Sequence, residues 1–129
     1  MGKIERFEDF IAWQKARELT RVVYQITQTG GFARDFALSG QMRRAAISIM
    51  SNIAEGFERK GRSEFHQFLS TAKASCAELR SHFYIAIDAA YVDEATFHRT
   101  LAMAEEVGRV LGGLRGSVER QRDAERHRM

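Results

Sequence analysis

The sequence predicts an all-α protein that folds as one antiparallel four-helix bundle with up-down-up-down topology. Three observations support this prediction. Apolar residues recur at three- and four-residue spacing in four segments of the 129-residue chain, which is the period of an amphipathic helix. The chain contains no proline, the residue that breaks helix interiors, so long helices are permitted. The connections between the segments are short, and short connections favour antiparallel neighbours.

The first predicted helix covers about residues 9–28. Asp9 is a suitable N-cap, because its carboxylate can accept a hydrogen bond from the first helical turn. The sequence Thr29-Gly30-Gly31 ends the helix, since glycine readily adopts the left-handed conformation of a C-terminal cap. The apolar positions of this segment are Phe10, Trp13, Ala16, Leu19, Val23 and Ile26.

The second predicted helix covers about residues 39–58. No charged residue occurs between Ala45 and Ala54, so this stretch must be covered by other helices on nearly all sides. Small side chains in the same stretch allow those helices to approach closely. The main apolar stripe consists of Leu38, Met42, Ala45, Ile49 and Ile53.

The third and fourth predicted helices run from the cap Ser63 to about residue 89 and from the cap Asp93 to about residue 119. The link 90–92 is very short, so these helices should form an antiparallel hairpin. Residues 120–129 contain few apolar side chains and are expected to be frayed or disordered, which leaves 1–119 as the bundle domain. The third apolar seam contains Phe65, Phe68, Leu69, Ala72, Cys76, Leu79, Phe83 and Ala86, and the fourth contains Phe97, Leu101, Ala104, Gly108, Leu111, Leu114 and Val118.

Two other helical arrangements remain open: an oligomer that exchanges helices between subunits, and a three-helix core with a mobile first helix.

The composition also limits the cellular compartment in which the protein is expected. A single cysteine excludes an intrachain disulfide and suits a reducing compartment. No apolar run approaches the roughly 20 residues that span a bilayer, and no secretory signal follows the charged start of the chain. We therefore expect a cytoplasmic protein without a membrane partner.

Three stretches of the sequence are distinctive: Phe10-x-x-Trp13-Gln14-Lys15-Ala16-x-x-Leu19, Leu38-x-x-Gln41-Met42-Arg43-Arg44-Ala45-Ala46-x-Ser48-Ile49-x-Ser51-Asn52-Ile53-Ala54-Glu55-Gly56, and Glu64-Phe65-x-x-Phe68-Leu69-x-x-Ala72-x-x-Ser75-x-x-Glu78-Leu79. Together they resemble the four helix bundle protein family, also called the 23S rRNA intervening-sequence proteins. The resemblance spans roughly residues 7–118, almost the whole chain. It departs from the family at Met50, where proline is usual, at Ala74, where glycine is usual, and in the loop 30–32, which lacks a common proline. Because interior proline kinks a helix, we expect the second helix to be straighter here.

The resemblance implies a four-helix bundle that assembles as a ring-like homopentamer. Family members occur as reading frames inside intervening sequences of rRNA genes, and many stand alone. The related accessory variability determinant proteins of diversity-generating retroelements form basic pentamers that bind nucleic acid and a reverse transcriptase. The molecular function of the wider family is not established, and no catalytic residues come with the resemblance.

The formal net charge of +3 originates in one part of the chain. Residues 31–62 contain six basic and three acidic residues, so this segment accounts for the whole excess. The two ends of the second helix lie roughly 30 Å apart, so a single chain offers two small basic patches. These patches either contact phosphates or are solvated bundle ends with ion pairs to Glu55, and a ring would repeat them and strengthen binding. The candidate nucleic-acid contacts are Arg43, Arg44, Arg59, Lys60 and Arg62.

A stripe of polar residues also runs along one side of the apolar second helix. Buried polar groups cost free energy unless they are paired, so these residues predict a structural network that caps loops or fixes the helix register. A functional pocket or a subunit contact is the alternative. We expect Asn52 and Glu55 to hydrogen-bond to the backbone of the connection 56–62. The predicted network comprises Gln41, Ser48, Asn52 and Glu55, with Arg44 on the same stripe.

Other chemical sites are weakly supported. His82 and His98 each follow a glutamate by four residues on either side of the 90–92 turn, which makes a metal site conceivable. Di-metal bundles use a three-residue Glu-x-x-His step instead, so we interpret these residues as surface pairs and predict no metal. Cys76 has no base within its helical turn and is interpreted as a buried core residue. The glycines at 112, 113 and 116 lack the strand and Lys-Ser/Thr of a phosphate-binding loop.

Aromatic residues near the predicted bundle ends have two interpretations. They can stack on nucleic-acid bases, but core or interface packing is more usual. These aromatic residues are Phe7, Phe10, Trp13 and Phe57.

The sequence thus predicts a non-catalytic homo-oligomer, pentameric by the resemblance, that needs no cofactor and acts as an adaptor for RNA, DNA or a nucleic-acid-processing protein. A purely structural or protein-interaction module is the alternative, and an enzyme lacks a convincing set of acid, base and nucleophile.

Overall fold

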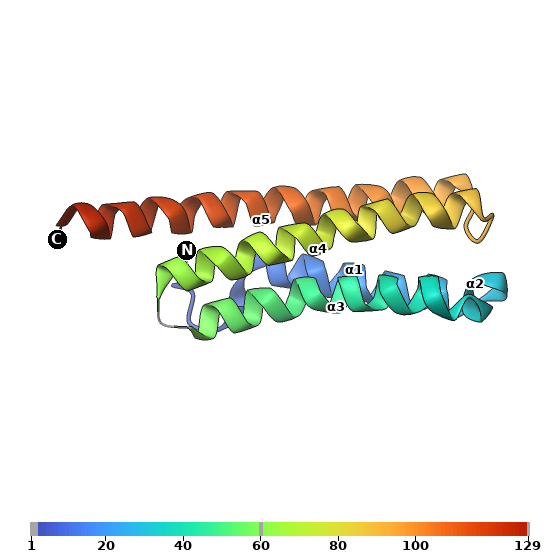
Figure 1. Cartoon of the computed structure of the whole chain (residues 1–129), viewed down its shortest axis with the longest axis horizontal. Coiled ribbons are helices and arrows are strands. Elements are labelled where there is room, and N and C mark those ends of the chain that lie inside the picture. The colour runs from blue at the N-terminus through green and yellow to red at the C-terminus, as the bar shows by residue number, and fades with distance from the viewer. Residues whose placement is uncertain (1–2, 60, 129) are drawn as a thin grey trace.

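The protein is a bundle of helices, and its computed structural model describes residues 3–59 and 61–128. Within these residues there is no strand. A 3-10 turn, η1 (Phe7–Asp9), precedes the first long helix, and a short helix, α2 (Gly30–Arg34), connects the first two long helices. Successive long helices run in opposite directions, which confirms the predicted up-down-up-down bundle (Figure 1). The long helices are α1 (Ile11–Thr27), α3 (Phe36–Glu58), α4 (Arg62–Asp88) and α5 (Glu94–Arg128).

The four long helices surround one hydrophobic core. α3 packs against α4, α4 packs against α5, and α1 packs against both α3 and α5. Each predicted apolar seam faces this interior, as Ile49, Leu79 and Leu111 are all 0% exposed. None of the described helices has the length and apolar character needed to span a bilayer.

The helix starts agree only partly with the predicted caps. Asp93 caps α5 as expected, because its Oδ1 accepts a hydrogen bond from the backbone N–H of Thr96 at 2.8 Å. Asp9 was predicted wrongly as the cap of α1: its carboxylate accepts the backbone N–H of Arg6 at 3.1 Å and closes η1, and Phe10 takes the cap position. Ser63 was also predicted wrongly, since α4 already begins at Arg62 and Gly61 is its N-cap.

The connection between α1 and α3 has more structure than the sequence predicts. Gly30 has the left-handed conformation expected of a glycine here, with a φ of 58°, but it is the first residue of α2, and the C-terminal cap of α1 is Gln28. The chain then forms α2 before α3 begins at Phe36, three residues earlier than expected. The earlier start is explained by Asp35, whose Oδ1 accepts the backbone N–H of Leu38 at 3.0 Å.

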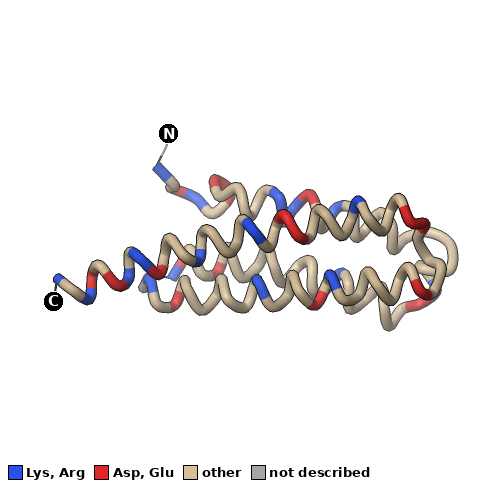
Figure 2. The backbone as a smooth tube through the Cα atoms, turned by 90° about the horizontal axis from the view of Figure 1, so that it is seen from above, with Lys and Arg blue, Asp and Glu red and all other residues tan. Residues whose placement is uncertain are grey.

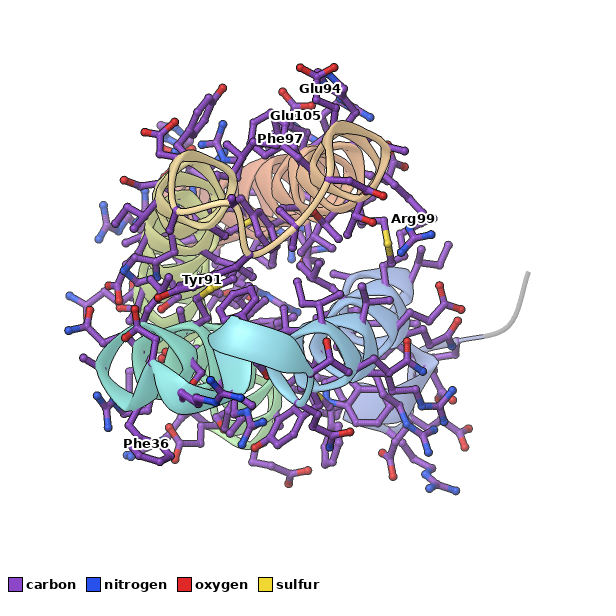
Figure 3. All side chains as sticks on the ribbon, turned by 90° about the vertical axis from the view of Figure 1, so that its right-hand side faces the viewer. Phe36, Tyr91, Glu94, Phe97, Arg99 and Glu105 are labelled. Carbon is purple, nitrogen blue, oxygen red and sulfur yellow. The ribbon has the colours of Figure 1, made fainter. Side chains whose placement is uncertain are left out.

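Tyr91 closes the end of the bundle that contains α2. Its ring stacks on the fully buried Phe32, with 5.1 Å between the ring centroids. Its hydroxyl donates a hydrogen bond to Oδ2 of Asp35 at 3.0 Å. Figure 3 looks onto this end and shows Tyr91 over the middle of the bundle, whereas Phe36 projects outward. Tyr91 therefore ties the α4–α5 turn to the start of α3.

α5 continues to Arg128, so residues 120–128 are helical where the sequence predicts a frayed or disordered end. The last buried side chain of α5 is Val118, and beyond it the helix projects past its neighbours (Figure 1). Charges of both signs alternate along this projecting end (Figure 2). Ion pairs such as Arg122 with Glu119, at 3.6 Å, support a solvated helix that has no apolar face.

α3 and α4 are in close contact at Gly56. A Cβ atom at this position would lie 2.7 Å from Cβ of Phe68 and 2.8 Å from Cδ1 of Phe65. Gly56 is buried inside α3 and not part of a loop. The close contact at this point therefore requires a residue without a side chain.

Candidate functional site

The predicted basic residues on α3 lie in its first half. Arg43 donates a hydrogen bond from Nε to Oγ1 of Thr27 at 2.9 Å, and its guanidinium lies 4.7 Å from the centre of the Tyr24 ring. These contacts hold Arg43 against α1. Arg44, the next residue, is exposed on the outer side of α3.

The predicted basic residues near the α3–α4 connection are compensated by carboxylates. Arg59 lies 3.8 Å from Glu64, and its guanidinium also covers the ring of Phe68 at 5.5 Å. Arg62 donates from Nε to Oε1 of Glu125 at 2.7 Å. Lys60 lies outside the described residues. The four described members of the predicted set, Arg43, Arg44, Arg59 and Arg62, lie near different ends of α3, and the role of the predicted basic residues in binding stays a prediction.

Two further arginines, on α1, lie on the same face of the bundle as Arg43 and lengthen the basic surface there. Arg17 and Arg21 border a cavity of about 440 Å³ between α1 and α3, together with Thr20, Tyr24, Gln25 and Met50. The guanidinium of Arg17 lies 5.8 Å from the centre of the Trp13 ring. We call Trp13, Arg17, Arg21, Tyr24 and Arg43 the arginine strip.

The arginine strip contains three cations and no carboxylate, so it is positively charged. No carboxylate of residues 3–59 and 61–128 forms an ion pair with Arg17, Arg21 or Arg43. The only nearby acid on α1, Glu18, lines a different cavity between α1 and α5. Sequence reasoning missed Arg17 and Arg21, although the four-residue spacing from Trp13 through both arginines placed them on one helix face.

Two of the residues in the predicted polar network, Ser48 and Asn52, form side-chain hydrogen bonds in the structure. The hydroxyl groups of Ser48 and Ser75 are 2.8 Å apart, joining α3 to α4. Asn52 donates from Nδ2 to the carbonyl oxygen of Ser48 at 2.8 Å, and not to the 56–62 connection as expected. Gln41 and Glu55 are exposed, and they form no side-chain hydrogen bond with any described residue. Sequence reasoning did not identify Ser75, because its partner lies 27 residues away.

The two candidate metal-binding histidines have different surroundings. His82 is 8% exposed, and its Nδ1 has no hydrogen-bond partner among the described residues. His98 is exposed and lies beside the ring of Phe97. In the described parts of the chain, no group of three or more His, Cys, Asp or Glu side chains is placed to hold a metal ion.

Cys76 is buried, with 1% of its surface exposed. Its thiol donates a hydrogen bond to the carbonyl oxygen of Ala104 at 3.0 Å. Burial raises the pKa of the Cys76 thiol above its ordinary value, while the charges of Arg80 and Lys73 oppose this rise. A thiol with a raised pKa is a poor nucleophile at neutral pH.

The aromatic residues predicted near the bundle ends pack mainly on one another. Phe10 contacts Phe57 edge-on, with 5.2 Å between the ring centroids, and Phe7 contacts Trp13 in the same way at 5.3 Å. Trp13 is the member of this group that also belongs to the arginine strip.

Comparisons with known proteins place this bundle among relatives. The model of a family described as 23S rRNA-intervening sequence protein matches residues 8–113. A crystal structure of a protein of unknown function from the S23 ribosomal protein family of Bacteroides thetaiotaomicron is similar, with a TM-score of 0.75 and 20% sequence identity. That match covers 82% of this chain and 96% of the other. At this identity the likeness shows the fold alone. No curated protein gave a match.

Proposed function

The chain belongs to the 23S rRNA-intervening sequence protein family, and from this premise we propose that it is a non-catalytic homo-oligomeric adaptor that binds nucleic acid. The observation that carries the proposal is the arginine strip. Three cations that form no ion pair with any described carboxylate lie beside two aromatic rings on the α1–α3 face. Cationic and aromatic side chains in this combination are typical of surfaces that bind phosphate backbones and unpaired bases.

The strip supports phosphate binding better than the α3–α4 connection does. Arg59 and Arg62 already pair with Glu64 and Glu125, so a phosphate would have to displace a carboxylate. Arg17 and Arg21 have no such competitor among the described residues. A guanidinium is planar and presents several donors, which suits it to phosphate oxygens.

Self-association is the second part of the proposal. The resemblance implies a ring-like homopentamer, and the outer surface of α3 and α4 carries exposed apolar side chains, including Ile47 at 43% and Ile85 at 49%. A ring repeats the arginine strip in each subunit. Repeated weak sites on one particle bind a long polyanion far more strongly than one site does, because each contact raises the effective concentration at the next.

Binding of labelled single-stranded RNA and DNA, followed by fluorescence anisotropy, tests the proposal. Arg17→Gln combined with Arg21→Gln should weaken binding at least about tenfold and reduce the dependence of affinity on salt. Arg59→Gln combined with Arg62→Gln removes the same charge from paired positions and should change affinity much less. Equal losses in both double variants, or no binding by the unmodified protein at about 50 mM salt, would contradict the proposal.

The exposed apolar residues favour a second candidate function, a structural or protein-interaction module without nucleic-acid affinity. Phe36 is 82% exposed at the start of α3, and such a large apolar side chain is costly to leave in water. Light scattering together with the anisotropy measurement separates the two functions. A homo-oligomer that binds neither RNA nor DNA would support the second.

A further inference from the structure

A second positively charged site lies on a different side of the bundle, between α4 and α5. A cavity of about 300 Å³ is bordered there by Lys73, Arg80 and Arg109, with one acid, Glu105, and with Cys76 and Gly108. No carboxylate in the described part of the chain forms an ion pair with Lys73 or Arg80. The cavity therefore carries more positive than negative charge.

Lys73 and Arg80 both line this cavity from α4. They are seven residues apart on α4, about 10 Å along the helix axis, with Cys76 between them. Both side chains point toward α5, and the charges of both act on the Cys76 thiol. Two flexible cations of this length can reach one anion bound above residue 76.

Two glycines on α5 allow the side chains of α4 to lie close to the α5 backbone beside this cavity. A Cβ atom at Gly108 would lie 3.8 Å from Sγ of Cys76, and one at Gly112 would lie 3.2 Å from Nζ of Lys73. Side chains at these positions would fill the space in front of Lys73 and Cys76. The other cation, Arg109, donates from Nε to Glu106 at 3.1 Å, which fixes its position at the rim.

We propose that the α4–α5 cavity binds a phosphate group. A phosphate group offers several acceptor oxygens and up to two negative charges, which match the separate donors of Lys73 and Arg80. The phosphate can belong to a small molecule or to a nucleic acid. This site is independent of the arginine strip, because it is built from the other two helices.

Calorimetric titration with inorganic phosphate, with adenosine monophosphate and with a short oligothymidylate tests the site. Lys73→Gln combined with Arg80→Gln should weaken binding of at least one of these ligands by about tenfold or more, because each lost charge-assisted hydrogen bond costs about that much. Arg120→Gln combined with Arg128→Gln removes the same charge from α5 beyond its last buried residue and should leave affinity nearly unchanged.

Which of the three ligands binds identifies the kind of molecule that supplies the phosphate group. Binding of phosphate or the mononucleotide indicates a small phosphorylated ligand, and binding of the oligothymidylate alone indicates a nucleic-acid backbone. Failure of all three to bind at about 10 mM, or equal weakening in both double variants, overturns the proposal. The arginine-strip variants retain Lys73 and Arg80. If only those variants lose nucleic-acid binding, the proposed function of the strip is affected and the α4–α5 site is not.

Discussion

Replacement of Gly56 by alanine should destabilise the protein, although alanine is the better helix former. Gly56 lies within α3, and the added methyl group would lie 2.7 Å from Cβ of Phe68 and 2.8 Å from a ring carbon of Phe65. Cβ of Phe68 is fixed to the backbone of α4. The clash is therefore relieved only if the two helices separate.

The expected magnitude follows from two opposing effects. Gly→Ala in a helix interior stabilises by about 1 kcal/mol, and overpacking a close contact costs about 1–3 kcal/mol. Gly56→Ala should therefore lower the free energy of unfolding by about 1 kcal/mol. Gly40 is a matched control in the same helix, since a Cβ there would meet nothing within 4 Å. Gly40→Ala should raise the free energy of unfolding by about 1 kcal/mol.

Urea denaturation of both variants at one protein concentration measures these changes. A fixed concentration is needed because self-association contributes to apparent stability. The helix-propensity gain is common to both variants, so the difference between their unfolding free energies isolates the steric cost at Gly56. If Gly56→Ala proves as stabilising as Gly40→Ala, the close packing of α3 and α4 described above is incorrect.

Three other outcomes are expected. Deletion of residues 120–129 should reduce helical circular dichroism but change the free energy of unfolding by less than about 1 kcal/mol, because the buried part of α5 ends at Val118. A larger loss in urea denaturation would mean that the projecting helix contributes to the core. The hydrogen bond to Asp35 raises the pKa of Tyr91, so its stabilisation is present below the ordinary tyrosine pKa and is lost as pH rises through the raised value. Asp35→Asn keeps a capping side chain and should shift Tyr91 ionisation, measured by ultraviolet absorbance, to lower pH; an unchanged titration would contradict the contact. Cys76 should react slowly with maleimide in the folded protein and rapidly in urea, and equal rates would show that it is not buried.

The four long helices were predictable because their apolar spacing depends only on neighbours within the same helix. The caps were less predictable, because several polar residues near each helix start compete for the same backbone donors. Asp9 closes the η1 turn and Ser63 lies inside α4. Asp93, in contrast, accepts the backbone N–H of Thr96 and caps α5 as predicted. The segment 120–128 carries charge pairs and lacks an apolar stripe, so periodicity gave no signal for the helix that the structure has there.

The candidate sites were harder to predict because each is shared between two helices. Arg43 was selected from the sequence, but its neighbours Arg17 and Arg21 lie more than 20 residues earlier and join it only through the packing of α1 on α3. Ser48 was selected without its partner Ser75 for the same reason. Periodicity identifies the face on which a residue lies but not the residue opposite it.

The placement of α1 between α3 and α5 also affects how the chain assembles during synthesis. The α3–α4 and α4–α5 pairs are each joined by a few residues, so closing them costs little loop entropy. α1 leaves the ribosome first, but its second neighbour, α5, is the last helix to be made. One side of its apolar face therefore stays exposed to water until translation is almost complete, and during that interval the nascent chain is most susceptible to pairing with another copy of itself.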